Sequence, residues 1–355
     1  MPKVVSNKLR PPALRRVKIH DLAKRCGLSI TTISQALNLG PDECRVSSKT
    51  RVRVKQVALE LGYRPSKAGR ALAIGRSQTV GILYSPPMPV VMDSIYAEIV
   101  SAAAAVLQAN EYHLLLVPLG DHNQHASHVL ADQMADGYLV LNNMHADLRD
   151  ILKLGGTSAV LVNLKSDLHL SHVLADDIGG MQKLVRHLLD LGHRRITYYC
   201  PASIDPHCSV QDREQAFLQT MREAGLSDHA CIVASPLRLF ADSMAAPAAG
   251  KRPTAIIVYA HQTAIPLLRM LWERGVRVPA DLSVATFNDV DFLADTIPPM
   301  TTVAIPTREL GQSAAHLLIE QLKSARGNAT PPTQAQVIVV AEHLVIRAST
   351  APPAG

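Results

Sequence analysis

The stretch that begins at Ile30 places hydrogen-bonding side chains at helical spacing. Thr31, Ser34 and Gln35 would share one face of a helix with Ile30, and no acidic residue stands on that face. In the major groove of DNA, base edges present donors, acceptors and the thymine methyl group. Short polar side chains and one aliphatic side chain can contact such edges. The pattern therefore predicts a helix that reads base pairs.

Three short helices are expected to position this face. The first helix should end at Cys26, because Gly27 can adopt the conformation of a turn. Ser29 is suited to cap the second helix, predicted over Ile30 to Leu37. A third helix follows Ser47, with apolar residues at positions i, i+3, i+4 and i+7. The first two helices with their short turn form a helix-turn-helix.

A small-residue segment with two cations, Ser66 to Ala73, follows Tyr63-Arg64-Pro65. Gly62 is expected to end the third helix, and Pro65 prevents its continuation. The segment is too short to form a stable helix alone. We expect it to become a hinge helix against DNA and a second copy of itself.

These motifs resemble those of the lactose-repressor/galactose-repressor (LacI/GalR) family of bacterial transcription regulators. The resemblance lies in "DLAKRCGLSITTISQALN" and then "VSSKTRVRVKQVALELGYRPSKAGRALA", and it continues through the rest of the chain. It implies an N-terminal all-α helix-turn-helix headpiece with a hinge helix. It also implies a C-terminal α/β two-lobed domain, similar to periplasmic binding proteins, in which a small-molecule effector binds between the lobes.

The resemblance assigns DNA contacts within the headpiece and the hinge. Leu72 matches an apolar wedge inserted into the minor groove, which would kink the duplex. Gln35 departs from the family, where arginine is usual, and would favour adenine over guanine. The loop from Leu39 to Cys44 is also longer than usual. The predicted DNA-binding residues are Ser29, Ile30, Thr31, Thr32, Ser34, Gln35, Asn38, Ser66, Lys67, Arg70, Leu72 and Ala73.

From Thr79 the pattern alternates strands and helices, which predicts doubly wound sheets. We divide the chain into a basic tail, a headpiece, a hinge with linker, and an effector and dimerisation domain: 1–16, 17–65, 66–78 and 79–350. The first lobe is expected over about 79–177 and 307–332. The second is expected over about 178–306 and 333–350, including strands at Val337 to Val340 and Leu344 to Arg347.

The resemblance also points to effector-binding residues. Arg213 in "DREQAF" matches an effector-binding arginine, whose guanidinium offers fixed donors to ligand oxygens. Ala260-His261 replaces the Asn-Asp pair usual in the family, which mildly favours an acidic sugar or another metabolite over a neutral sugar. The predicted effector-binding residues are Tyr84, Ser85, Tyr96, Ser209, Arg213, His261 and Asn288.

The charge distribution supports a nucleic-acid partner. The chain carries a net charge of +6, but Met1 to Arg76 hold 17 basic and 4 acidic residues, a net of +13. The remainder has a net of −7. A basic head suits a phosphate backbone. No membrane-length apolar run, secretory signal or disulfide pattern is apparent in the sequence, so we expect a cytoplasmic protein.

Other candidate chemistry is weak. His122, His125 and His128 recur every three residues, but a solvated helix explains them better than a metal site. Neither phosphate-loop spacing nor a nucleophile elbow is present. We therefore predict no catalytic residues, no metal and no cofactor.

The sequence favours a dimeric repressor that binds pseudo-palindromic double-stranded operator DNA under the control of a small effector, a sugar or a sugar acid. Three alternatives stay open. The effector could be a nucleobase or another non-sugar metabolite. The chain could be a solute-binding receptor, which the basic headpiece opposes, or an enzyme, for which no catalytic constellation is present.

Overall fold

A computed structural model describes residues 17–38, 46–64, 76–84, 94–119, 134–141, 146–153, 156–202, 207–245, 252–325 and 335–354. The chain divides after Gln78 into two compact units, a small helical one and a large α/β one. No helix among the described residues is long and apolar enough to cross a membrane.

The small unit contains the three predicted helices, α1 (Ile19–Cys26), α2 (Ile30–Asn38) and α3 (Ser48–Glu60). Gly27 has a φ of +66°, and its N–H bonds to the carbonyl of Ala23, so α1 ends in a left-handed cap. Ser29 Oγ accepts from the N–H of Thr32 at 3.1 Å. Ser47 Oγ accepts from Thr50 at 3.3 Å. Both predicted caps are therefore present. The shared core holds Leu22, Ala23, Cys26, Ile33, Ala36, Val54 and Ala58.

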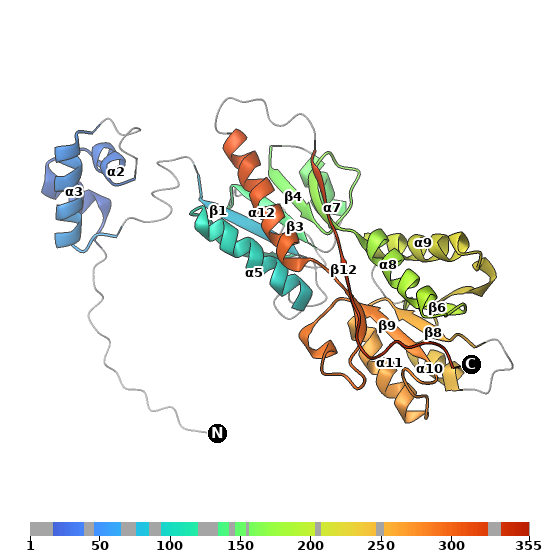
Figure 1. Ribbon diagram of the computed structural model, residues 1–355. Helices are drawn as coiled ribbons and strands as arrows, with labels where there is room; N and C mark the ends of the chain where they lie inside the picture. Colours follow the sequence, from blue (N-terminus) through green and yellow to red (C-terminus); the bar gives the residue numbers. More distant parts are fainter. Residues whose placement is uncertain are drawn as a thin grey trace, which may run out of the picture. The chain divides into compact units, whose positions relative to one another are not determined.

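The large unit contains two six-stranded sheets (Figure 1). The first is parallel, in the order β11-β5-β4-β3-β1-β2. Its strands are β1 (Thr79–Tyr84), β2 (His113–Pro118), β3 (Gly137–Leu141), β4 (Ser158–Val162), β5 (Ser171–Ala175) and β11 (Val337–Val340). We call this sheet and its helices the first lobe.

The second sheet has the order β12-β10-β9-β8-β6-β7. Only its β10–β12 pair is antiparallel. Its strands are β6 (Ile196–Tyr199), β7 (Ala230–Val233), β8 (Ala255–Val258), β9 (Ser283–Phe287), β10 (Thr301–Ala304) and β12 (His343–Val345). This sheet and its helices form the second lobe.

Helices cover both faces of each sheet, which accounts for the almost wholly apolar strands. In the first lobe, α5 (Ser94–Ala109) packs beside α12 (Thr307–Ser324) on one face, and α7 (Ala146–Lys153) lies on the other. In the second lobe, the pairs are α8 with α9 and α10 with α11. Their bounds are Asp177–Asp190, Cys208–Glu223, Leu237–Ala245 and His261–Glu273. Two 3₁₀ turns cover Ser227–His229 and Asp291–Leu293.

Three segments cross between the lobes, after β5, after β10 and after β11. The third crossing corrects our prediction, because Val337 to Val340 pair with β5 in the first sheet and not with the second. Only the strand at 343–345 joins the second sheet. The sequence of a four-residue apolar strand does not indicate which sheet the strand joins. The pairing is decided by the free edge of β5, which a strand following α12 can reach.

Candidate DNA-binding and effector sites

Helix α2 presents part of the predicted DNA-reading face to solvent. Ser29 and Thr31 are exposed, and the Ile30 side chain is 46% exposed. Thr32, Ser34, Gln35 and Asn38 are half-buried. Ser29 is engaged as the helix cap, and Asn38 Nδ2 donates to Ser34 Oγ at 3.2 Å. Ile30 and Thr31 are thus the residues best placed to meet a base edge directly.

The other predicted DNA contacts, Ser66, Lys67, Arg70, Leu72 and Ala73, lie outside the described residues. So do Ser85 of the predicted effector site and the histidines at 122, 125 and 128. Among the described residues, no group of three or more His, Cys, Asp or Glu side chains could hold a metal ion.

Arg213 of α9 is the centre of a buried charged cluster in the second lobe. It is 2% exposed, which excludes the alternative of a surface ion pair. Its Nε donates to Asp177 Oδ1 at 2.6 Å, and its Nη1 donates to the carbonyl of Tyr259 at 2.8 Å. The guanidinium lies 3.8 Å from the Phe287 ring centre, a cation–π contact. Arg213 therefore ties together a crossing segment, the end of β8 and the end of β9.

A second acid, Glu342, lies on the third crossing close to the same guanidinium. Its Oε1 is 3.9 Å from Arg213 Nη2, too far for a hydrogen bond. Burial, and after it the charge of Asp177, raise the pKa of Glu342 to about 8, although Arg213 opposes the shift. Burial lowers the pKa of Arg213, but Asp177 and Glu342 outweigh it and leave a net increase. At neutral pH the cluster is one ion pair with one neutral carboxyl group.

A chain of hydrogen bonds runs from Tyr259 to the first lobe. His207 Nδ1 accepts from the N–H of Ser209 at 3.2 Å, so the ring proton must be on Nε2, which donates to the Asn163 carbonyl at 2.7 Å. Ser209 Oγ then donates to Nδ1 at 2.7 Å and accepts from the Tyr259 hydroxyl at 2.9 Å. Burial lowers the pKa of His207, which keeps the ring neutral. The predicted residue Ser209 thus lies on the same helix as Arg213, and His207 continues the chain of hydrogen bonds to Asn163 in the first lobe.

The remaining predicted effector residues lie at strand ends and on helices. Tyr84 ends β1, and Tyr96 lies in the first turn of α5; both pack against the apolar core. His261 begins α11, is 5% exposed and meets the Phe292 ring edge-on at 5.8 Å. Asn288 follows β9 with a φ of +70°. The carboxyl ends of strands in open α/β sheets are the usual ligand position.

Sequence reasoning missed Asp177, His207, Tyr259 and Glu342. Asp177 and Glu342 carry one recognisable signal, because each acid comes two residues after the end of an apolar strand. His207 precedes a helix beside a predicted site residue, but histidine is not a typical cap. Nothing local to Tyr259 distinguishes it from an ordinary strand-end tyrosine.

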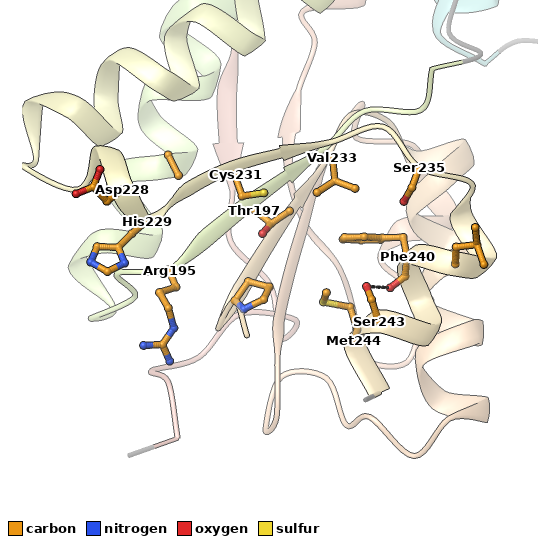
Figure 2. Close-up of a pocket in the computed structure, with 13 residues that line it drawn as sticks. Arg195, Thr197, Asp228, His229, Cys231, Val233, Ser235, Phe240, Ser243 and Met244 are labelled. Atoms are coloured by element: carbon orange, nitrogen blue, oxygen red, sulfur yellow. Dashed lines mark hydrogen bonds between the residues drawn. The ribbon is translucent and has the colours of Figure 1, made fainter. Parts of the chain in front are cut away.

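The pocket in Figure 2 lies elsewhere in the second lobe. It has a volume of about 650 Å³ and is lined by β6, β7 and α10, with Thr197, Cys231 and Val233 on the strands and Phe240, Ser243 and Met244 on the helix. Arg195, Asp228 and His229 also line it. It contains none of the predicted effector residues, and it is separate from the cluster around Arg213.

Comparisons with known proteins agree with this architecture. Residues 18–66 match the model for bacterial regulatory proteins of the lacI family, and residues 185–350 match that for a periplasmic binding protein-like domain. The HTH-type transcriptional regulator DegA of Bacillus subtilis (strain 168) is 27% identical over 348 residues, which cover 95% of this chain and 99% of DegA.

Two solved structures share the fold over nearly the whole chain. The lac repressor dimer bound to operator and an anti-inducer is 22% identical, with a TM-score of 0.77 over 95% of this chain and 100% of that chain. A CelR–cellobiose complex is 25% identical, with a TM-score of 0.65 over 94% and 100%.

A helix-turn-helix unit followed by a two-sheet α/β unit defines a class of DNA-binding transcription regulators, which are not enzymes. Within that class, this chain belongs to the LacI family of bacterial regulatory proteins, as its motifs predicted.

Proposed function

We propose that the protein is a homodimeric repressor whose operator affinity is set by an uncharged, hydroxyl-bearing metabolite bound beside Arg213 and Ser209. The observation that supports the uncharged class is the pairing of Arg213 with Asp177 at 2.6 Å. A guanidinium whose charge is balanced by a buried carboxylate can still donate hydrogen bonds to a ligand hydroxyl. It no longer provides the net positive charge that would attract a ligand carboxylate. Hydroxyl groups can also accept from Arg213 and donate to Asp177.

This proposal departs from the acidic sugar that the Ala260-His261 replacement favoured. Asp177 already balances the charge of Arg213, and the neutral Glu342 adds none, so the cluster offers an anionic ligand no net positive charge. An anionic ligand would lie near Asp177 in a site of low dielectric, where like charges repel strongly. The CelR–cellobiose complex shows that a relative of the same fold takes a neutral sugar.

Matched ligands test the effector class. We would compare the thermal midpoint of the full chain with glucose, glucuronate, gluconate and glucosamine, and with other sugars and nucleobases in the same screen. We expect stabilisation by uncharged members only, because ligand that binds the folded state raises the midpoint. Stabilisation by an acid, without its neutral counterpart, would contradict the proposal.

Repression requires specific DNA binding by two headpieces. In support, α2 carries no acid and the lac repressor fold binds its operator as a dimer. A dimer with two-fold symmetry requires a pseudo-palindromic operator, with one half-site for each headpiece. Selection from random duplexes should recover such a site, and light scattering should give a dimer mass. Recovery of an asymmetric single half-site, or a monomer mass, would oppose this part of the proposal.

A further inference from the structure

Glu342 is a buried acid that the effector proposal does not use. Its side chain is 0% exposed, and neither carboxyl oxygen has a hydrogen-bond partner among the described residues. Buried polar groups are nearly always hydrogen-bonded, because an unpaired one forfeits its hydration. An unpaired carboxyl group therefore calls for a partner in another state of the protein.

Within the part of the chain that the structure describes, the surroundings of Glu342 leave it one suitable partner. A side chain at Gly180 would overlap Glu342 Oε2, so the carboxyl group fills the space beside the first turn of α8. The charged groups around it are Asp176, which caps α8, Asp177 and Lys183 on α8, and Arg213 on α9. Lys183 Nζ is already bonded to the backbone carbonyl of Glu342 at 2.6 Å. Among the charged groups of the described residues, Arg213 faces the carboxyl group as the remaining possible donor, with its Nη2 at 3.9 Å.

We propose that Glu342 is the second counter-ion of Arg213, and that the guanidinium exchanges Asp177 for Glu342 when the protein changes state. The geometry requires little movement, since a charge-assisted hydrogen bond of roughly 2.8 Å is about 1 Å shorter than the present separation. Arg213 would move from a carboxylate on the first crossing to one on the third. The exchange is therefore a two-state element that acts directly on the segments joining the lobes.

The exchange also links the site to protons. Burial raises the pKa of Glu342 to about 8, so at neutral pH the group holds a proton while it has no partner. When Arg213 approaches, the carboxyl group ionises and the proton passes to bulk water. An effector hydroxyl that binds Asp177 can then draw that carboxylate away without leaving Arg213 as an uncompensated buried charge. Glu342 is thus a positioning residue that acts through Arg213.

The proposal relies on the proposed function only for placing the effector beside Arg213, and its test uses no effector. The first measurement is the thermal midpoint of the full chain and of Glu342→Gln from pH 5 to pH 9. The unfolded carboxyl group ionises near its ordinary value, whereas the folded one keeps its proton to about pH 8. Wild-type stability contributed by this group is therefore lost as pH rises between those values.

Glu342→Gln removes the ionisation and keeps the shape. We expect its midpoint to exceed that of the wild type at pH 8, with the gap closing toward pH 5. Glu320→Gln, at an exposed position on α12, is the matched control and should show no such gap. A pH-independent difference for Glu342→Gln would overturn the proposal.

The second measurement repeats Glu342→Gln in an Asp177→Asn background at pH 8. Asp177→Asn removes the first counter-ion, so Glu342 should ionise and take its place. Glu342→Gln should then lower the midpoint, although it raises the midpoint when Asp177 is present. The same sign in both backgrounds, or an Asp177→Asn protein that does not fold, would overturn the proposal. Failure of every metabolite in the effector screen would leave this sign reversal unaffected.

Discussion

The two candidate sites of this chain use opposite kinds of surface. On α2, Ile30 and Thr31 are exposed and lie outside the apolar core of the small unit. In the second lobe, Arg213 and Asp177 are buried and hold a helix, a crossing and two strand ends together. The difference teaches that the exposed DNA contacts Ile30 and Thr31 can be changed without cost to folding, whereas the buried effector contact Arg213 cannot. Variants should therefore separate binding from stability in one unit and join them in the other.

The largest expected effect comes from Arg213→Ala. It leaves Asp177 as a buried carboxylate without its cation, and removing one partner of a buried pair costs about 3–5 kcal/mol. Urea unfolding should show this loss, together with loss of the effector response. Protein that stays folded should still bind operator, because α2 is in the other unit. Arg222→Ala, at an exposed position on the same helix, is the control. If Arg213→Ala changed the free energy of unfolding by less than about 0.5 kcal/mol, the effector site would tolerate substitution as well as the exposed face of α2 does.

An intermediate effect on DNA binding is expected from Gln35→Ala. Loss of a bidentate base contact costs about 1–3 kcal/mol of discrimination, or roughly 5-fold to 150-fold in affinity. Fluorescence anisotropy on the selected operator should show this loss, and Gln35→Arg should shift preference from adenine toward guanine. Gln56→Ala, at an exposed position on α3, should leave affinity unchanged. Equal losses on operator and random DNA would mean that Gln35 contacts phosphates.

The smallest effect on stability is expected from Ser47→Ala, a substitution within the small unit that removes a structural contact and no predicted DNA contact. The hydroxyl caps α3 through Thr50, and loss of such a cap costs about 1 kcal/mol. Thermal unfolding of the full chain, followed for the small unit, should detect it. Ser48→Ala, one residue inside the helix, is the control. An unchanged midpoint for Ser47→Ala would show that water replaces the cap.

Local chemistry explains which parts were predictable from the sequence. Gly27, Ser29 and Ser47 mark helix ends by their own backbone and side-chain preferences, and the observed helices begin and end there. The strand at Val337–Val340 was predicted but assigned to the wrong lobe, because strand pairing depends on contacts distant in sequence. The same limit hid Glu342, whose role depends on Arg213, 129 positions earlier in the numbering.

The three crossings also set the order in which the lobes can be completed during synthesis. Five strands of the second sheet lie between Ile196 and Ala304, so that lobe emerges from the ribosome almost in one piece. The first lobe begins earlier but lacks α12 and β11 until Val340 has been made. At about 5–20 residues per second, this delay is on the order of ten seconds. During that time β5 is an uncovered edge, and the apolar side of α5 has no partner helix. The lobe that starts first therefore waits longest for its missing helix and strand, and it is the one most exposed to aggregation in the growing chain.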